Sequence, residues 1–274
     1  MEPYWDVIKR IIEESDLVLE ILDARLVELS RNEEVERLIE DIGRPMIFVV
    51  NKSDLVSHDS LKKQVKELRE KGEVVFISAK SPKITKILLY AIKKVFGKYG
   101  KREFVKIGKY EPKPKYREAK ADIVVGVLGY PNVGKSSIIN ALAHKKKVKV
   151  SKKAGTTHGI HWIKATNEIK LIDSPGVIPL ARDDEIRYGL IGARDNERLK
   201  NPELVAYAII KLFMKASPKF FENFYKIEIK DKSAEEIIEE IGKKRSYLIK
   251  GGIVDENRTC SAVIRDWQEG KLRL

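Results

Sequence analysis

The stretch that decides the fold is Gly129-Tyr130-Pro131-Asn132-Val133-Gly134-Lys135-Ser136, which fits the pattern G-x-x-x-x-G-K-[ST]. It follows a strand-like run at 123–128 and opens a helix-like run at 136–143. Its glycines let backbone N–H groups turn inward around phosphate oxygens, and the helix N-terminus adds a partial positive charge. A glycine-rich turn that binds nothing is the alternative, but the strand–loop–helix context favours a phosphate-binding P-loop.

Within this loop, we expect Lys135 to reach the β- and γ-phosphates and to act in catalysis, while Ser136 binds magnesium. The nucleotide contacts are completed by Asn132, Val133, Gly134 and Ser137.

A second phosphate-side motif is Asp173-Ser174-Pro175-Gly176, at the end of the strand-like run 169–172. The Asp173 carboxylate would hold magnesium, usually through water, and the Gly176 amide would sense the γ-phosphate. Between the two motifs, Gly155-Thr156-Thr157 lies in a loop that can order on triphosphate binding. One of the two threonines would complete the magnesium shell, and spacing alone does not choose between them.

Asn51-Lys52-Ser53-Asp54 directly follows an apolar run at 45–50, and it is the candidate guanine-reading motif. An aspartate at a strand end accepts hydrogen bonds from the guanine ring N–H and exocyclic amine, which adenine lacks in that geometry. The triplet Ser78-Ala79-Lys80 ends the next strand-like run, where its amides would support the guanine carbonyl. We therefore assign Asn51, Lys52, Asp54, Ser78, Ala79 and Lys80 to nucleotide binding.

The guanine motifs precede the P-loop, whereas ordinary Ras-like chains place them after it, so the order is that of a circular permutation. In content and order, the sequence resembles the circularly permuted GTPases of the YlqF/YawG family, which are bacterial, archaeal and organellar ribosome-assembly GTPases. Further matches are Asp23-Ala24-Arg25, Ser30-Arg31-Asn32, Pro131-Asn132-Val133 and Arg265-Asp266-Trp267-Gln268-Glu269-Gly270-Lys271.

The resemblance implies a P-loop NTPase fold with a mostly parallel sheet, followed by a small helical domain. It selects Thr157 as the catalytic switch threonine and magnesium ligand, and it makes Asn132 the residue that positions a potassium ion. Val177 stands where Ras-like enzymes carry a water-orienting glutamine. The implied cofactors are GTP or GDP, Mg²⁺ and K⁺, and the implied partner is rRNA of a large-subunit precursor.

The motifs and the resemblance imply a circularly permuted GTPase domain at 1–180, with a lysine-rich connecting arm at about 97–120. They also imply a helical domain at 181–274, which is expected to contact RNA or the ribosome. Helical spacing predicts helices at 4–14, 33–42, 61–71, 83–96, 202–214 and 259–269. Short apolar or β-prone runs predict strands at 17–22, 45–50, 74–77 and 123–128, and a hairpin at 161–165 with 169–172. Ser233 and Glu236 have the spacing of a capping box.

Charge is distributed unevenly along the chain. Of 54 Lys+Arg and 41 Asp+Glu, residues 1–100 hold 18 basic and 18 acidic side chains, whereas residues 101–153 hold 15 and 4. A solvated, thermophile-like surface would explain the charge density but not this asymmetry. The asymmetry favours a polyanionic partner, and RNA is the expected one. Residues 243–274 add 8 basic against 4 acidic side chains.

The single cysteine, Cys260, excludes a disulfide framework, a disulfide-linked partner and cysteine-based zinc or iron–sulfur sites, and it fits a reducing cytoplasm. No apolar run is long enough to span a membrane. We expect a cytoplasmic monomer in which Trp162, Trp267 and Cys260 are packed residues.

The expected function is hydrolysis of GTP to GDP and phosphate, coupled to binding of rRNA. One alternative is a nucleotide-gated RNA-binding factor with negligible turnover, which a single-turnover assay would separate. Another is a small-molecule kinase that uses ATP, against which the Asn51–Asp54 motif argues.

Overall fold

The computed structural model describes residues 4–101, 123–143, 161–173 and 184–274. The described residues build a sheet in the order β3-β2-β1-β4-β6-β5, in which all neighbours run parallel except the β5–β6 pair. The mostly parallel α/β fold is therefore confirmed, including the 161–172 hairpin. The strands are β1 (Leu17–Asp23), β2 (Met46–Asn51), β3 (Glu73–Phe76), β4 (Ile123–Leu128), β5 (His161–Lys164) and β6 (Ile169–Asp173).

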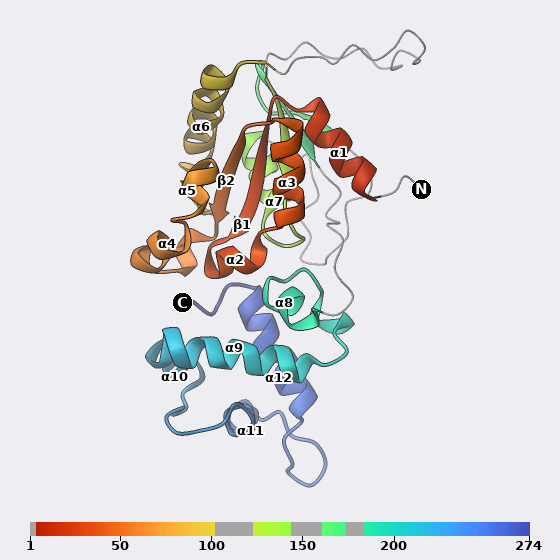
Figure 1. Cartoon of the computed structure of the whole chain (residues 1–274). Helices are drawn as coiled ribbons and strands as arrows, with labels where there is room; N and C mark the ends of the chain where they lie inside the picture. Colours follow the sequence, from red (N-terminus) through yellow and green to blue (C-terminus); the bar gives the residue numbers. More distant parts are fainter. Residues whose placement is uncertain (1–3, 102–122, 144–160, 174–183) are drawn as a thin grey trace.

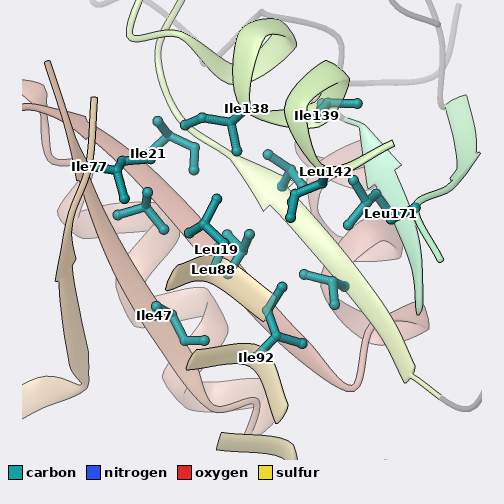
Figure 2. Packing of buried hydrophobic residues seen from close by; sticks show 14 of the residues in the cluster. Leu19, Ile21, Ile47, Ile77, Leu88, Ile92, Ile138, Ile139, Leu142 and Leu171 are labelled. Atoms are coloured by element: carbon teal, nitrogen blue, oxygen red, sulfur yellow. The ribbon is translucent and has the colours of Figure 1, made fainter. Parts of the chain in front are cut away.

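Helices cover both faces of the sheet, because strands in a parallel sheet are apolar on both sides. Leu19 and Ile21 of β1 pack with Leu88 of α6 and Ile138 of α7 on one face (Figure 2). Val18 and Leu22 pack on the other face with α1 and α3. The helices of this part are α1 (Tyr4–Glu14), α2 (Val27–Ser30), α3 (Glu33–Ile42), α4 (His58–Gln64), α5 (Leu68–Lys71), α6 (Ile84–Tyr99) and α7 (Lys135–Leu142).

The C-terminal helices form their own apolar core against one end of the sheet (Figure 1). Phe213, Phe221 and Trp267 are fully buried there, and Cys260 is buried as expected. The predicted capping box is present, since Ser233 and Glu236 bond each other's backbone N–H groups. These helices are α8 (Glu185–Leu190), α9 (Pro202–Ala216), α10 (Pro218–Tyr225), α11 (Ala234–Lys244) and α12 (Glu256–Gln268).

Helix α8 contacts both cores. Its Tyr188 packs in the core of the sheet, whereas Leu190 packs with α9 and α12. The domain boundary expected at 180 lies outside the described residues and stays a prediction. Among the residues that the structure describes, no helix combines the length and the hydropathy needed to cross a membrane.

Two predicted elements need correction. The helix expected at 61–71 is two short helices, α4 and α5, separated by Val65 to Glu67. The Gln64 side chain accepts the N–H of Val27 and donates to the Ala24 carbonyl, which fixes the end of α4 on a neighbouring turn. Helix α6 continues past 96 to Tyr99, so the connecting arm cannot begin at Gly97; the rest of the arm, from 102 on, lies outside the described residues.

Trp162 is 44% exposed on the edge strand β5, so its prediction as a packing residue is wrong. Its strand neighbour Ile163 takes the buried side, because successive side chains point to opposite faces. The same expectation is confirmed for Trp267.

Candidate functional site

The P-loop lies between β4 and α7, as the motif predicts, and two of its glycines have no room for a side chain. Gly129 and Gly134 have φ of 144° and 106°, which L side chains rarely adopt. A Cβ on Gly134 would lie 2.2 Å from Asn51 Nδ2, and one on Gly129 would lie 2.6 Å from the Ile21 carbonyl oxygen. The loop therefore requires glycine for both conformation and space.

Lys135 is buried at the start of α7, with its ammonium group turned back into the loop. Its Nζ donates to the carbonyl oxygens of Gly129, at 2.6 Å, and Tyr130, at 2.7 Å. Burial lowers the pKa of Lys135 to about 8, although the charge of Asp173 opposes this shift. Ser136 and Ser137 are half-buried in the first turn of the same helix. The lysine expected to contact phosphates is thus held by the loop itself.

Asn51 joins three of the predicted motifs. It is buried at the end of β2; its Nδ2 donates to the Val133 carbonyl at 2.7 Å, and its Oδ1 accepts the Ala79 N–H at 3.1 Å. The first bond reaches the P-loop and the second reaches the Ser78–Lys80 triplet. The structure therefore brings the phosphate and guanine motifs together at one edge of the sheet, through a side chain that positions both loops.

Asp54 follows Asn51 in a 3₁₀ turn, Ser53–Leu55, and its side chain is 36% exposed. Its Oδ2 lies 3.5 Å from Lys80 Nζ, so two of the predicted guanine residues face each other. Lys52 adopts a left-handed backbone conformation with φ of 62° and sends its side chain away from this pair, 2.7 Å from Asp23 Oδ2. Asp54 is accessible at this edge, whereas Lys52 is paired with the buried carboxylate of Asp23.

The Asp23 carboxylate is the centre of a buried network that sequence reasoning did not assign. Arg25 Nη2 donates to Asp23 Oδ2 at 2.7 Å, and its Nη1 donates to the Trp267 carbonyl. The Arg25 guanidinium also lies 4.0 Å from the centre of the Trp267 ring. Burial alone would raise the pKa of Asp23, but the charges of Arg25 and Lys52 outweigh it and hold that pKa well below the usual value. The sequence indicated this network only indirectly, since its residues Asp23-Ala24-Arg25 and Trp267 match the family's motifs without an assigned role in the site.

Asp173 ends β6 and is buried beside the P-loop lysine. Its Oδ2 has no hydrogen-bond partner among the described residues. Burial raises the pKa of Asp173 to about 6, and the charges of Lys135 and His161 oppose the rise. A buried carboxylate oxygen of this kind fits a magnesium ion, which binds oxygen ligands. Within the described ranges, no three His, Cys, Asp or Glu residues form a cluster that could hold a metal ion.

Asn132 and Tyr130 connect the P-loop to its surroundings. Asn132 has a left-handed φ of 60°, and its Nδ2 donates to the Gly192 carbonyl, just after α8, at 2.7 Å. Tyr130 Oη accepts from Asn32 Nδ2 at 3.2 Å, which places the Ser30-Arg31-Asn32 match beside the loop. The predicted switch residues Thr157 and Gly176 lie outside the described residues, as do 155–156 and 174–175.

Comparison with known proteins identifies the family. Residues 124–250 match the family described as 50S ribosome-binding GTPase. An uncharacterized GTP-binding protein of Methanocaldococcus jannaschii is 38% identical over 98% of this chain and 66% of its own length. The ribosome biogenesis GTPase A of Bacillus cereus is 30% identical, over 94% of this chain and 84% of that protein. The chain belongs to the YlqF-type circularly permuted GTPases.

This YlqF-type assignment agrees with solved structures. The GDP-bound YlqF from T. maritima has a TM-score of 0.63 and 22% identity, covering 97% of this chain and 95% of that one. At this identity the likeness concerns the fold. The chain spans only part of some relatives: 52% of nucleolar GTP-binding protein 2 from Pneumocystis carinii, at 30% identity, and 66% of the M. jannaschii protein.

Proposed function

We propose that this YlqF-type chain binds GTP with Mg²⁺, hydrolyses it to GDP and phosphate, and uses the nucleotide state to control binding to a large ribosomal subunit precursor. The observation that carries the proposal is the pair of hydrogen bonds that the Asn51 side chain makes, one with Val133 and one with Ala79. Through it, one rigid edge of the sheet presents a phosphate loop and a guanine carboxylate together. A binder of phosphate alone has no use for that second loop.

On the phosphate side, the donors are the Lys135 ammonium group and the N–H groups of the loop, and Asp173 offers a free carboxylate oxygen among the described residues. Magnesium, when bound, would neutralise negative charge on the phosphates. Lys135, Ser136 and Asp173 would hold the triphosphate and this ion. In the proposal, Thr157 and Gly176 complete the switch at the γ-phosphate.

On the guanine side, we expect Asp54→Asn to weaken GTP binding by about tenfold to a hundredfold. Two hydrogen bonds to a charged acceptor are lost, at about 1.5–3 kcal/mol each before compensation by the amide. The same variant should gain affinity for xanthosine triphosphate, whose ring carbonyl accepts from the new amide. Competition binding with GTP, ATP and xanthosine triphosphate measures both effects, with Asp59→Asn on the exposed helix α4 as the control. Equal affinity of the unmodified protein for ATP and GTP would show that Asp54 does not read guanine.

We also propose that a potassium ion positioned by Asn132 accelerates hydrolysis in place of an arginine finger, in a chain that carries Val177 where Ras-like enzymes have a water-orienting glutamine. The rate in potassium should exceed the rate in sodium, and Asn132→Gly should remove the difference. Glycine tolerates the left-handed φ of 60° at this position, so the backbone is kept while the amide is lost. Steady-state hydrolysis at constant ionic strength measures this, and equal rates in both salts would exclude the ion.

The ribosomal partner is supported by the family description and by relatives named for ribosome biogenesis. It is also supported by three basic stretches, at 101–120, 145–153 and 243–274, of which the first two fall mainly outside the described residues. We propose a cytoplasmic location with the ribosomes.

Co-sedimentation of the full chain with ribosomal particles tests the proposal as a whole. We expect it to sediment with a large-subunit precursor in a non-hydrolysable GTP analogue and to be released in GDP. Single-turnover hydrolysis with and without particles separates a GTPase from a binding factor with negligible turnover. If the chain sediments equally well in the GTP analogue and in GDP, the nucleotide does not control binding. If it sediments with no particle, the proposed ribosomal partner is wrong.

A further inference from the structure

Helix α6 and the residues that flank it form an exposed face on which every charged side chain is a lysine. Residues 80–101 contain seven lysines and no aspartate or glutamate, although residues 1–100 as a whole are balanced in charge. All seven lysines are exposed. We call this surface the α6 face; its lysines are Lys80, Lys83, Lys86, Lys93, Lys94, Lys98 and Lys101.

The lysines are arranged in a stripe. Lys83, Lys86, Lys94 and Lys98 follow one another around an exposed tyrosine, Tyr90, at helical spacings of three and four residues. Tyr90 is 72% exposed in the middle of the stripe. The opposite side of the helix is buried against the sheet, so the stripe runs the length of a 16-residue helix, about 24 Å.

Helix stability does not explain this pattern. Lys94 and Lys98 are four residues apart and repel each other, and Lys86 is in the first turn, where a positive charge opposes the helix dipole. Other exposed helices place opposite charges at this spacing, as Lys9–Glu13 in α1 and Lys243–Glu239 in α11 do. The lysines of α6 therefore destabilise the helix itself, which favours the interpretation that they bind an external anion.

Acidic neighbours neutralise only part of the face. Lys93 pairs with Glu168 at 2.7 Å, Lys94 with Glu73 at 2.8 Å, and Lys80 with Asp54 at 3.5 Å. These ion pairs are exposed, so each is worth at most about 1 kcal/mol and yields readily to a stronger anion. For the other four lysines, the structure gives no ion pair among the described residues.

We propose that the α6 face binds a single-stranded stretch of RNA, with its phosphates along the lysine stripe and one unpaired base stacked on Tyr90. Regularly spaced lysines with an exposed aromatic ring between them fit a single nucleic-acid strand. The lysines pair with its phosphates, and the ring stacks on a base, since every base has a flat face. A membrane surface fits less well, since the apolar side of α6 is already buried against the sheet.

The position of this face connects it to the nucleotide site. Helix α6 begins four residues after Lys80 of the guanine motif, and Thr85 Oγ1 donates to the Ala141 carbonyl of the P-loop helix at 3.1 Å. The inference deepens the proposed function, on which it rests, because it places an RNA contact on the GTPase half of the chain and away from the basic C-terminal helices.

The experiment measures binding of the full chain to a labelled single-stranded RNA of about twelve nucleotides across a range of salt concentrations. We expect RNA binding to weaken at least about tenfold in the triple variant Lys83→Gln, Lys86→Gln and Lys98→Gln. The slope of log binding constant against log salt concentration should become shallower by about 2, since each lost phosphate contact of a single strand contributes about 0.7. The matched control is Lys62→Gln, Lys63→Gln and Lys66→Gln, which removes the same charge from exposed residues around α4 and should change affinity less than about twofold. Equal effects of the two triple variants would overturn the proposal.

Tyr90 supplies a second, charge-independent test. Tyr90→Ala should weaken RNA binding by about fivefold to tenfold, while Tyr90→Phe keeps the stacking face and stays within about twofold. Binding of the α6 face to phosphatidylserine vesicles in preference to RNA would also overturn the proposal. Co-sedimentation distinguishes failure of the proposed function from failure of the α6 face. If the chain does not sediment with ribosomal particles, the proposed function is refuted. If the chain does sediment with them but the α6 triple variant binds RNA as tightly as the control variant, only the α6 face is refuted.

Discussion

Lys135→Ala is expected to weaken GTP binding by at least about a hundredfold, equivalent to about 2.7 kcal/mol. The ammonium group is buried and turned toward the loop that would receive the phosphates, and hydrogen bonds from a charged donor are worth about 1.5–3 kcal/mol each. Titration calorimetry with GTP measures the loss. Lys62→Ala, which removes an exposed lysine from α4, is the control and should leave affinity unchanged.

The same lysine predicts a pH dependence. Because burial lowers the pKa of Lys135 to about 8, the free protein loses this charge as the pH rises through that value. Phosphate binding requires the charged form, so GTP affinity should fall between pH 7 and pH 9. The fall should be smaller in Lys135→Ala. An alanine variant that binds GTP as tightly as the unmodified chain would contradict the P-loop assignment.

Arg25→Ala is expected to lower the free energy of unfolding by about 3–5 kcal/mol, because it removes one partner of a buried ion pair. Asp23 would keep Lys52 and the backbone N–H of residue 25, and the Trp267 carbonyl would lose a donor. Denaturant unfolding measures the change. The matched control, Arg37→Ala, breaks an exposed pair with Glu33 at 3.4 Å and should cost less than about 0.5 kcal/mol.

A double variant makes this prediction specific. Asp23→Asn together with Arg25→Ala should cost less than the sum of the two single variants, since either substitution alone already breaks the Asp23–Arg25 ion pair. GTP affinity should also fall in Arg25→Ala, because Lys52, one partner of Asp23, lies two residues before the guanine carboxylate Asp54. If Arg25→Ala destabilises the protein no more than Arg37→Ala, the network does not hold the C-terminal helices against the sheet.

Local sequence patterns were enough to predict the strands, most helices and the position of each nucleotide motif along the chain. A continuous apolar run indicates a buried parallel strand such as β4, and the glycines of the P-loop mark positions where the backbone takes a positive φ. Since the carboxyl ends of parallel strands meet at one edge of the sheet, the position of each motif after a strand was enough to predict that Asp54, Lys135 and Asp173 lie along that edge. These are local or topological properties, which short stretches of sequence carry.

The contacts that hold these residues in place join parts of the chain that are far apart in the sequence. The partners of Asn51 are 28 and 82 positions away, and Arg25 reaches Trp267 across 242 positions. No local pattern encodes such contacts, because they depend on how the sheet packs against the C-terminal helices. The same holds for exposure: Trp162 lies on an edge strand and is exposed, while Trp267 is buried between α8 and α9. The lysines of α6 became one surface only when the helix turned all of them away from the core.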